Sequence, residues 1–347
     1  MKTRALLLAL LMPNILSATE LSGPAPRPAY SGNTSLANLQ CAGCHRAIAE
    51  EWRKSLHHNA YVNSYFSRAV KIEAVNFCRK CHAPDADPSR DPPPPVASDG
   101  VSCLSCHWTS QGIVGSHGIG DAVAPNHFRA GDNRFSDDRA CANCHEFDFP
   151  SGANNPVMTA MQSTVTEHKA SRFSDRACQA CHMPLVADSD GRQHRSHDFA
   201  VQGNQRLFAQ AVSVKLIARH PSSVTVELST GAIGHAFPTG DLFRAAELRL
   251  WVSEPNGQVL SEARYRLERS YRSDLLHQTR RVLLDTRLVP KDGKDAKRTV
   301  ELPLVAEAYK IHYSVSWQRM PEQLAVRLGL DPKAQSHVIL EGVLAEP

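Results

Sequence analysis

The motif Cys-x-x-Cys-His occurs five times between residues 41 and 182, and it constrains this chain more than any other feature. The copies use all ten cysteines: Cys41 and Cys44, Cys78 and Cys81, Cys103 and Cys106, Cys141 and Cys144, and Cys178 and Cys181. The motif is the attachment sequence of c-type haem, because two thiols three residues apart lie on one face of a helical turn. Both can therefore bond to the vinyl groups of one porphyrin. The sequence predicts five covalently attached haems c, each with its iron.

The histidine that closes each motif is predicted to be the proximal iron ligand. These residues are His45, His82, His107, His145 and His182. A Cys-x-x-Cys pair by itself would also suit a disulfide or half of a zinc site. Neither alternative requires a histidine directly after the second cysteine, and five such coincidences favour haem.

The 347 residues are enough for two domains. Residues 1–18 begin with basic positions, continue as a short apolar run and end in small residues, which predicts a cleaved signal peptide. The run is too short to cross a bilayer, and no later segment is long and apolar enough. Residues 19–37 are predicted to be an exposed linker. Residues 38–200 form the predicted pentahaem domain, mainly irregular with short helices, since the porphyrins supply much of the buried apolar area.

Residues 205–347 contain no cysteine and show apolar residues at every second position. Such alternation predicts strands with one buried face. The clearest runs are at 212–216, 224–228, 248–252, 311–317 and 338–343. Turn residues separate about eight short strands, so the predicted fold class is α+β, with a cytochrome c domain followed by an antiparallel β-sandwich.

Seventeen histidines are present, and those outside the motifs are candidates for the second axial position of each iron. A haem with two histidine ligands has no open position and only passes electrons. The candidates beside the motifs are His57 in preference to His58, His117 in preference to His127, His168, and His197 in preference to His194.

His235 is a further candidate, because it follows Gly234 in a proline-containing loop of the second domain. Such a loop suits a plain turn, and it also suits the projection of an imidazole toward the haem domain. Four other histidines are expected to be structural: His220, His277, His312 and His337. Methionines 158, 161 and 183 lie near the motifs as alternative ligands, and histidine is preferred while it is this plentiful.

The formal net charge of +4 does not describe the holoprotein, since each haem adds two propionates. A mildly acidic protein is expected, which argues against a nucleic-acid partner. The basic stretch from Arg264 to Arg272 is interpreted as a solvated strand face, with docking to an acidic redox partner as the alternative.

Several motifs together resemble a family of exported multihaem c-type cytochromes, related to the tetrahaem electron shuttle of ammonia oxidisers and more distantly to the hydroxylamine oxidoreductase superfamily. They are Cys41 to His45 followed by Trp52-x-x-Ser55-x-His57, Gly100-Val101 before Cys103, Met161-Gln-x-Thr164-x-x-Glu167, Cys178 to Pro184, Gly234 to Gly240, and Asp285-Thr-Arg287-Leu-x-Pro290. The resemblance covers nearly the whole chain and supports His57, His197 and His235 as distal ligands. The chain departs from it at His168 and in having five motifs.

The expected function is electron transfer through closely packed bis-histidine haems, in the periplasm or at the extracellular surface. Expected partners are donor and acceptor cytochromes or a quinol-oxidising complex. The sequence leaves self-association open, including a subunit of a haem filament. The alternative from another class is an oxidoreductase with one open-site haem that acts on a small nitrogen compound.

Overall fold

The fold is that of a computed structural model. The structure describes residues 30–72, 76–110, 112–115, 134–148, 160–199, 201, 204–274, 279–304 and 310–345. The predicted signal peptide at 1–18 therefore lies outside the described residues, as do His117, His127, Met158 and His277. No helix within the described ranges has the length and apolar character that crossing a bilayer demands.

Short helices carry the motif-bearing part of the chain. They are α1 Thr34–Cys44, α2 Arg46–Lys54, α3 Ser64–Ile72, α4 Asn76–His82, α5 Pro94–Asp99, α6 Cys103–His107, α7 Arg139–His145, α8 Thr164–Lys169 and α9 Gln179–His182, with a 3-10 turn η1 at Arg134–Ser136. Helix α1 begins four residues before the predicted domain start at 38, because the Asn33 side chain accepts a hydrogen bond from the Leu36 amide at 2.9 Å and caps it.

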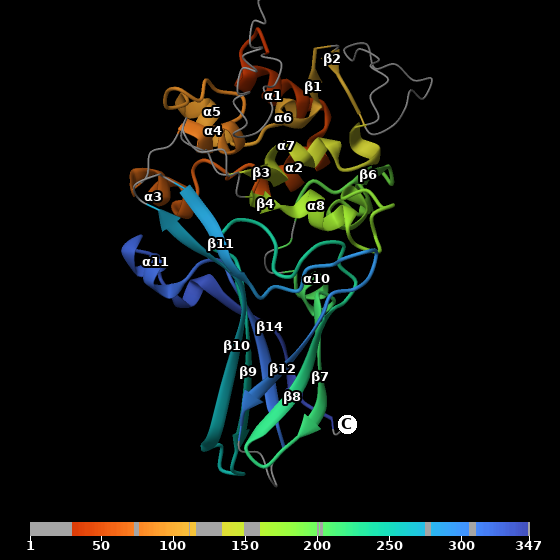
Figure 1. Ribbon diagram of the computed structural model, residues 1–347. Coiled ribbons are helices and arrows are strands. Elements are labelled where there is room, and N and C mark those ends of the chain that lie inside the picture. Colours follow the sequence, from red (N-terminus) through yellow and green to blue (C-terminus); the bar gives the residue numbers. More distant parts are fainter. Residues whose placement is uncertain are drawn as a thin grey trace, which may run out of the picture.

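Small two-stranded sheets are interspersed among these helices. They pair β1 Trp108–Thr109 with β2 Gly112–Ile113, β3 Glu146–Asp148 with β4 Ala160–Ser163, and β5 Leu185–Ala187 with β6 Gln193–Arg195. Figure 1 shows the motif-bearing helices gathered at one end of the molecule, with longer strands extending from them to the other end. The structure therefore mixes helices with antiparallel sheets, as predicted.

The second half of the chain forms two larger antiparallel sheets. Its elements are α10 Gln205–Ala209, β7 Val212–Arg219, β8 Ser223–Thr230, β9 Ala245–Ser253, β10 Val259–Asp274, β11 Thr279–Asp285, β12 Lys297–Pro303, β13 His312–Gln318, α11 Glu322–Arg327, η2 Lys333–Gln335 and β14 Ser336–Val343. One sheet has the order β11-β10-β9-β13-β14, and the other has the order β12-β8-β7. The five clearest alternating runs of the sequence correspond to β7, β8, β9, β13 and β14, and β8 alternates strictly between buried and half-buried positions.

One hydrophobic core lies between residues 208 and 344 and draws side chains from both larger sheets. Leu228 of β8, together with Leu248 and Leu250 of β9, is 0% exposed. Across the described residues, the one other hydrophobic cluster centres on Met320, Ala325 and Leu328, with Tyr65 packed against it. The motif-bearing helices have no comparable cluster within the described ranges.

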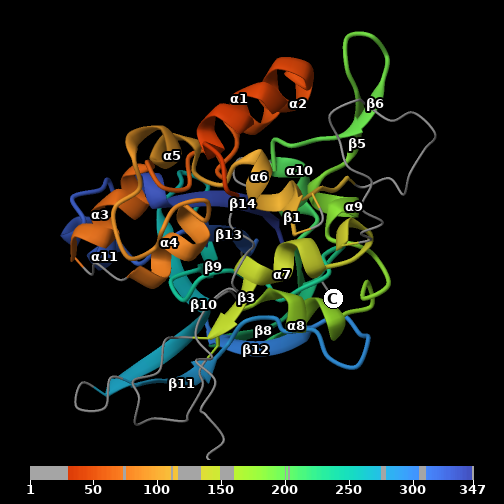
Figure 2. The ribbon, with the colours of Figure 1, turned by 90° about the horizontal axis from the view of Figure 1, so that it is seen from above.

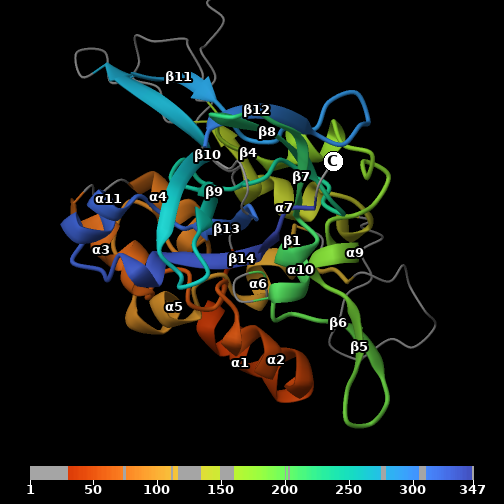
Figure 3. The same cartoon turned by 90° about the horizontal axis from the view of Figure 1, so that it is seen from below.

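Helices α3 and α11 connect the two halves of the chain. Tyr65 of α3 packs on the cluster at α11, and the Arg68 guanidinium donates to the carbonyl of Leu328 at 2.9 Å. The view from above shows these two helices side by side (Figure 2). The long strand β10 and its partner β11 extend outward from the other strands when the molecule is seen from below (Figure 3).

The first part of the basic stretch in β10, Arg264 and Arg266, is paired with acidic neighbours. Arg264 forms ion pairs with Glu262 at 2.6 Å and Glu247 at 2.7 Å, and Arg266 pairs with Glu268 at 2.8 Å. Such exposed pairs each contribute about 0 to 1 kcal/mol to stability. The contacts agree with the interpretation of a solvated strand face.

Candidate haem-binding sites

Each Cys-x-x-Cys-His motif lies at the end of a short helix. Helices α4, α6, α7 and α9 all end at the motif histidine, while His45 forms the junction between α1 and α2. The two cysteines of each motif are therefore one helical turn apart, as the spacing predicted. None of the ten motif cysteines, all of which lie in the described ranges, forms a disulfide.

Three motif histidines face a second histidine that the sequence analysis proposed as a distal ligand. The ring centroids of His107 and His197 are 6.3 Å apart, and those of His182 and His235 are 6.2 Å apart, with interplanar angles of 26° and 20°. The rings of His57 and His145 are 6.4 Å apart at 67°. Imidazole nitrogens bind a metal at about 2 Å, so two rings on opposite sides of one iron have centroids about 6 Å apart.

The hydrogen bonds of these histidines determine which ring nitrogen remains for iron. The Nδ1 atoms of His82, His107 and His197 each lie 2.7 Å from a backbone carbonyl, of Ala60, Val114 and Arg195 respectively. The Nδ1 atom of His235 lies 2.9 Å from the Ala236 carbonyl. A carbonyl only accepts, so Nδ1 must carry the proton and donate, and Nε2 keeps its lone pair for a metal.

A local arrangement around His57 explains several residues of the first motif region. The Trp52 indole donates to the Val101 carbonyl at 2.8 Å, and the Val101 amide donates to the His57 carbonyl at 2.9 Å. Gly100 has φ +56°, and a Cβ there would lie 2.6 Å from the same carbonyl oxygen. Only glycine fits this approach, so Trp52, Gly100 and Val101 together fix the backbone from which His57 faces His145.

Burial keeps the paired histidines neutral, which is the form that binds iron. Burial, and then the positive charge that neighbouring histidines would carry, lower the pKa of His57 to about 4. The same causes lower the pKa of His182 to about 4, with His235 the largest contributor after burial. Burial also lowers the pKa of His145 and of His197.

These pKa values predict that the protein loses stability in mild acid. For His57 and His182 the pKa falls from an ordinary 6.5 to about 4 on folding, so the unfolded chain binds more protons between these values. In the chain without haem, the contribution of each of these histidines to stability should be constant above pH 6.5 and fall by roughly 3 kcal/mol as the pH drops from 6.5 to 4. Thermal unfolding of the haem-free chain between about pH 7 and pH 4 measures this. A constant Tm over that interval would contradict the prediction.

The other candidate histidines have different surroundings. The His58 ring meets the Trp52 ring edge-on at 4.4 Å, and His194 Nε2 lies 3.1 Å from the Glu51 carboxylate. The His168 ring lies against Gly234, where an added Cβ would be 2.9 Å from His168 Cδ2. His168 stays a prediction as an iron ligand. His117 and His127 also stay predictions, since they lie outside the described residues.

Two histidines expected to be structural stack on tryptophans within the strands. His312 stacks on Trp251 at 5.4 Å, and His337 stacks on Trp317 at 6.3 Å. These contacts give both rings a role in packing on the sheet.

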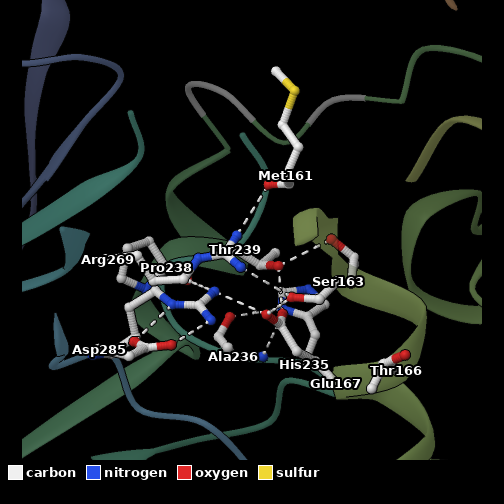
Figure 4. A network of polar contacts seen from close by, with 12 residues as sticks. Met161, Ser163, Thr166, Glu167, His235, Ala236, Pro238, Thr239, Arg269 and Asp285 are labelled. Carbon is white, nitrogen blue, oxygen red and sulfur yellow. Dashed lines mark hydrogen bonds and ion pairs between the residues drawn. The ribbon is translucent and has the colours of Figure 1, made fainter. Parts of the chain in front are cut away.

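A buried charged network next to His235 was not predicted as part of the site. Glu167 in α8 is 4% exposed and forms an ion pair at 2.8 Å with Arg287, which is 5% exposed. Figure 4 shows Glu167 between the end of α8 and the loop that carries His235. Arg287 also pairs with Asp285 at 2.8 Å. The only sequence signal for this network was that Glu167 and Arg287 each belong to a motif that resembles the multihaem cytochrome family. Nothing in the sequence indicated that the two residues are in contact.

Arg269 connects the network to β4. Its guanidinium donates to the Met161 carbonyl at 3.1 Å and to Ser163 Oγ at 3.3 Å. The sequence predicted that Arg269 lies on a solvated strand face. This prediction is wrong, because Arg269 is only 9% exposed. The burial arises because this part of β10 passes beneath the motif-bearing region, where β4 covers it.

Cysteines from different motifs also meet. The Cys41 and Cys103 thiols are in hydrogen-bonding contact, as are Cys81 and Cys144. Cys141 makes the same contact with Cys178. The attachment points of the first and third motifs, the second and fourth, and the fourth and fifth are therefore adjacent.

Comparisons with known proteins agree with this geometry. The family model described as "Cytochrome c554 and c-prime" matches residues 40–108, which contain the first three motifs. The fold is similar to the crystal structure of a penta-heme cytochrome c552 from Thermochromatium tepidum, with a TM-score of 0.66 and 19% sequence identity over 92% of this chain and 100% of that chain. A search of curated proteins gave no match. These likenesses support a multihaem c-type cytochrome, while the relationship to hydroxylamine oxidoreductases stays a prediction.

Proposed function

We propose that this chain is a pentahaem c-type cytochrome that transfers electrons between redox partner proteins through closely packed haems. The observation that carries the proposal is the set of three histidine pairs, each with ring centroids 6.2 to 6.4 Å apart and each containing a motif histidine. In this assignment His107 and His197 ligate the third iron, His145 and His57 the fourth, and His182 and His235 the fifth. An iron with two such ligands passes electrons and offers no position to a substrate.

The contacts between motif cysteines support a continuous route. Contact between Cys41 and Cys103 brings the first porphyrin to the third, and contact between Cys141 and Cys178 brings the fourth to the fifth. Cys106 lies near enough to Cys141 to contribute to the raised pKa of that thiol, which supports proximity of the third and fourth motifs. Electrons would move from the first haem through the third and fourth to the fifth, with the second haem joining at the fourth.

The proposal includes an exported holoprotein with a cleaved signal peptide, a haem domain at 38–200 and a sheet domain at 205–347 whose two larger sheets stack as a β-sandwich. The shared hydrophobic core of the two sheets supports the stacked arrangement. Periplasmic donor and acceptor cytochromes, or a quinol-oxidising complex, are the proposed partners. Thioether attachment in an exported chain motivates the location.

Haem content is the direct test of the proposal. A pyridine haemochrome assay combined with the intact mass of the mature protein should give five covalent haems and a new N-terminus near residue 18. Fewer than four covalent haems would contradict the pentahaem proposal. A substantial high-spin ferric signal in the resting protein, or fast cyanide binding, would instead favour the oxidoreductase.

A further inference from the structure

The carboxylate of Glu167 is surrounded by hydrogen-bond donors. Its Oε1 accepts from Ser163 Oγ at 2.8 Å and from Arg287 Nη1 at 2.8 Å. Its Oε2 accepts from the Ala236 amide at 3.2 Å and from Thr239 Oγ1 at 2.6 Å. Four donors converge on one buried anion, so these contacts are charge-assisted and directional.

Both ends of the loop segment after His235 are held by this network. Glu167 binds the amide of Ala236, the residue next to His235, and the Thr239 hydroxyl farther along (Figure 4). Between them, the Pro238 carbonyl accepts from Arg287 Nη1 at 3.3 Å. The Phe237 backbone pairs with Leu288 in both directions, at 2.9 and 3.0 Å. The backbone that carries His235 is thus fixed against α8 and against the segment after β11 that contains Arg287.

A stability role alone does not account for this pair. Removing two opposite charges from water costs about as much as their attraction returns, so a buried ion pair contributes little net stability compared with apolar packing. What the pair does provide is a fixed geometry. Glu167 contacts the loop at both ends with the same carboxylate, and Arg287 holds that carboxylate in place.

We propose that Glu167 is a positioning residue that holds His235 at the separation from His182 that an iron requires, and that its negative charge favours the ferric state of the fifth haem. This inference rests on the proposed function, in which His182 and His235 are the axial pair. Arg287 acts through Glu167 by orienting its carboxylate. Because a nearby anion stabilises the more positive oxidation state, loss of the charge should raise the reduction potential of that haem.

The experiment compares Glu167→Gln with the wild-type holoprotein. The glutamine amide keeps the size of the side chain, but its NH2 group cannot accept from the donors that face it. We expect a partial high-spin signal from one haem, about tenfold faster cyanide binding at that haem, and a raised potential for it. Electron paramagnetic resonance, stopped-flow cyanide binding and a spectroelectrochemical titration give the three readouts.

Two further variants keep the test decisive. Thr239→Val removes the 2.6 Å hydrogen bond to the carboxylate while the Arg287 pair remains, so it should accelerate cyanide binding with a smaller change in potential. Thr239→Val also tests the inference if the Glu167→Gln variant does not fold. Glu262→Gln is the matched control, since Glu262 also pairs with an arginine, Arg249, but lies on the exposed face of β10. That control should match the wild type in all three readouts.

The outcomes separate this inference from the proposed function. If His235→Ala remains fully low-spin, the axial assignment itself fails. If His235→Ala becomes high-spin while Glu167→Gln and Thr239→Val keep the wild-type spin state, cyanide rate and potential, and only their Tm falls, then Glu167 merely supports the fold and the positioning inference is overturned.

Discussion

Replacement of His235 by alanine is expected to leave one iron five-coordinate and to convert that haem from low spin to high spin. The reason is that His235 faces His182 with a ring separation of 6.2 Å, while the other two pairs use different histidines. The remaining haems should keep their spectra. Electron paramagnetic resonance and the visible absorption of the ferric protein measure the change, which should amount to about one haem in five.

The same variant should also weaken the attachment between the haem-bearing helices and the strands, because an Fe–N bond across them is lost. Added imidazole should restore the low-spin spectrum by occupying the vacated position. His312→Ala is a suitable control, since His312 stacks on Trp251 in the sheet. A fully low-spin His235→Ala variant with an unchanged redox titration would show that His235 is a turn residue, and His127 or His168 would then take its assignment.

The double variant Cys141→Ala/Cys144→Ala is expected to lose the fourth haem and with it the electron route. Cys141 contacts Cys178, and Cys144 contacts Cys81, so the fourth porphyrin is the one that the second and fifth haems both adjoin. Intact mass should fall by one haem. After rapid partial reduction, electron transfer from the first and third haems to the second and fifth haems should slow to the rate of exchange between separate molecules, while exchange between the first and third haems stays fast.

Cys41→Ala/Cys44→Ala supplies the matched control, because it also removes one haem but does so at the end of the proposed route. Electron redistribution among the third, fourth and fifth haems should remain as in the wild type. Equally fast redistribution in the Cys141→Ala/Cys144→Ala variant would contradict the central position of the fourth haem. Thermal unfolding of both variants shows whether each is folded.

The sequence predicted the motif helices and several strands, because each of them depends on residues that are close together in the chain. The five motifs end short helices because two cysteines and a histidine in five residues need a helical turn to face one porphyrin. Strands β7, β8, β9, β13 and β14 coincide with the predicted runs of alternating apolar residues, as β8 shows with its buried valines Val224 and Val226. His57 faces His145 while His58 packs on Trp52, and the preference for His57 as an iron ligand stays a prediction.

Contacts between distant residues could not be predicted in the same way. The sequence proposed His57, His197 and His235 but did not assign them to particular irons, because the pairing depends on how separate helices pack. The Glu167 and Arg287 pair has the same origin, since its members belong to α8 and to a segment after β11. Arg269 was misassigned because one strand, β10, passes from solvent to a covered region along its length.

The three histidine pairs have a topological consequence if iron bridges each of them. Every bridge closes a loop of chain as a disulfide would, and such a closure can lower the free energy of folding by about 3 to 5 kcal/mol through chain entropy. The three loops overlap along the sequence. The loop from 57 to 145 contains His107, and the loop from 107 to 197 contains His145 and His182. The last loop runs from 182 to 235. The irons would thus be successive cross-links, and together they would tie the segment after α2 to the loop of the sheet domain that carries His235.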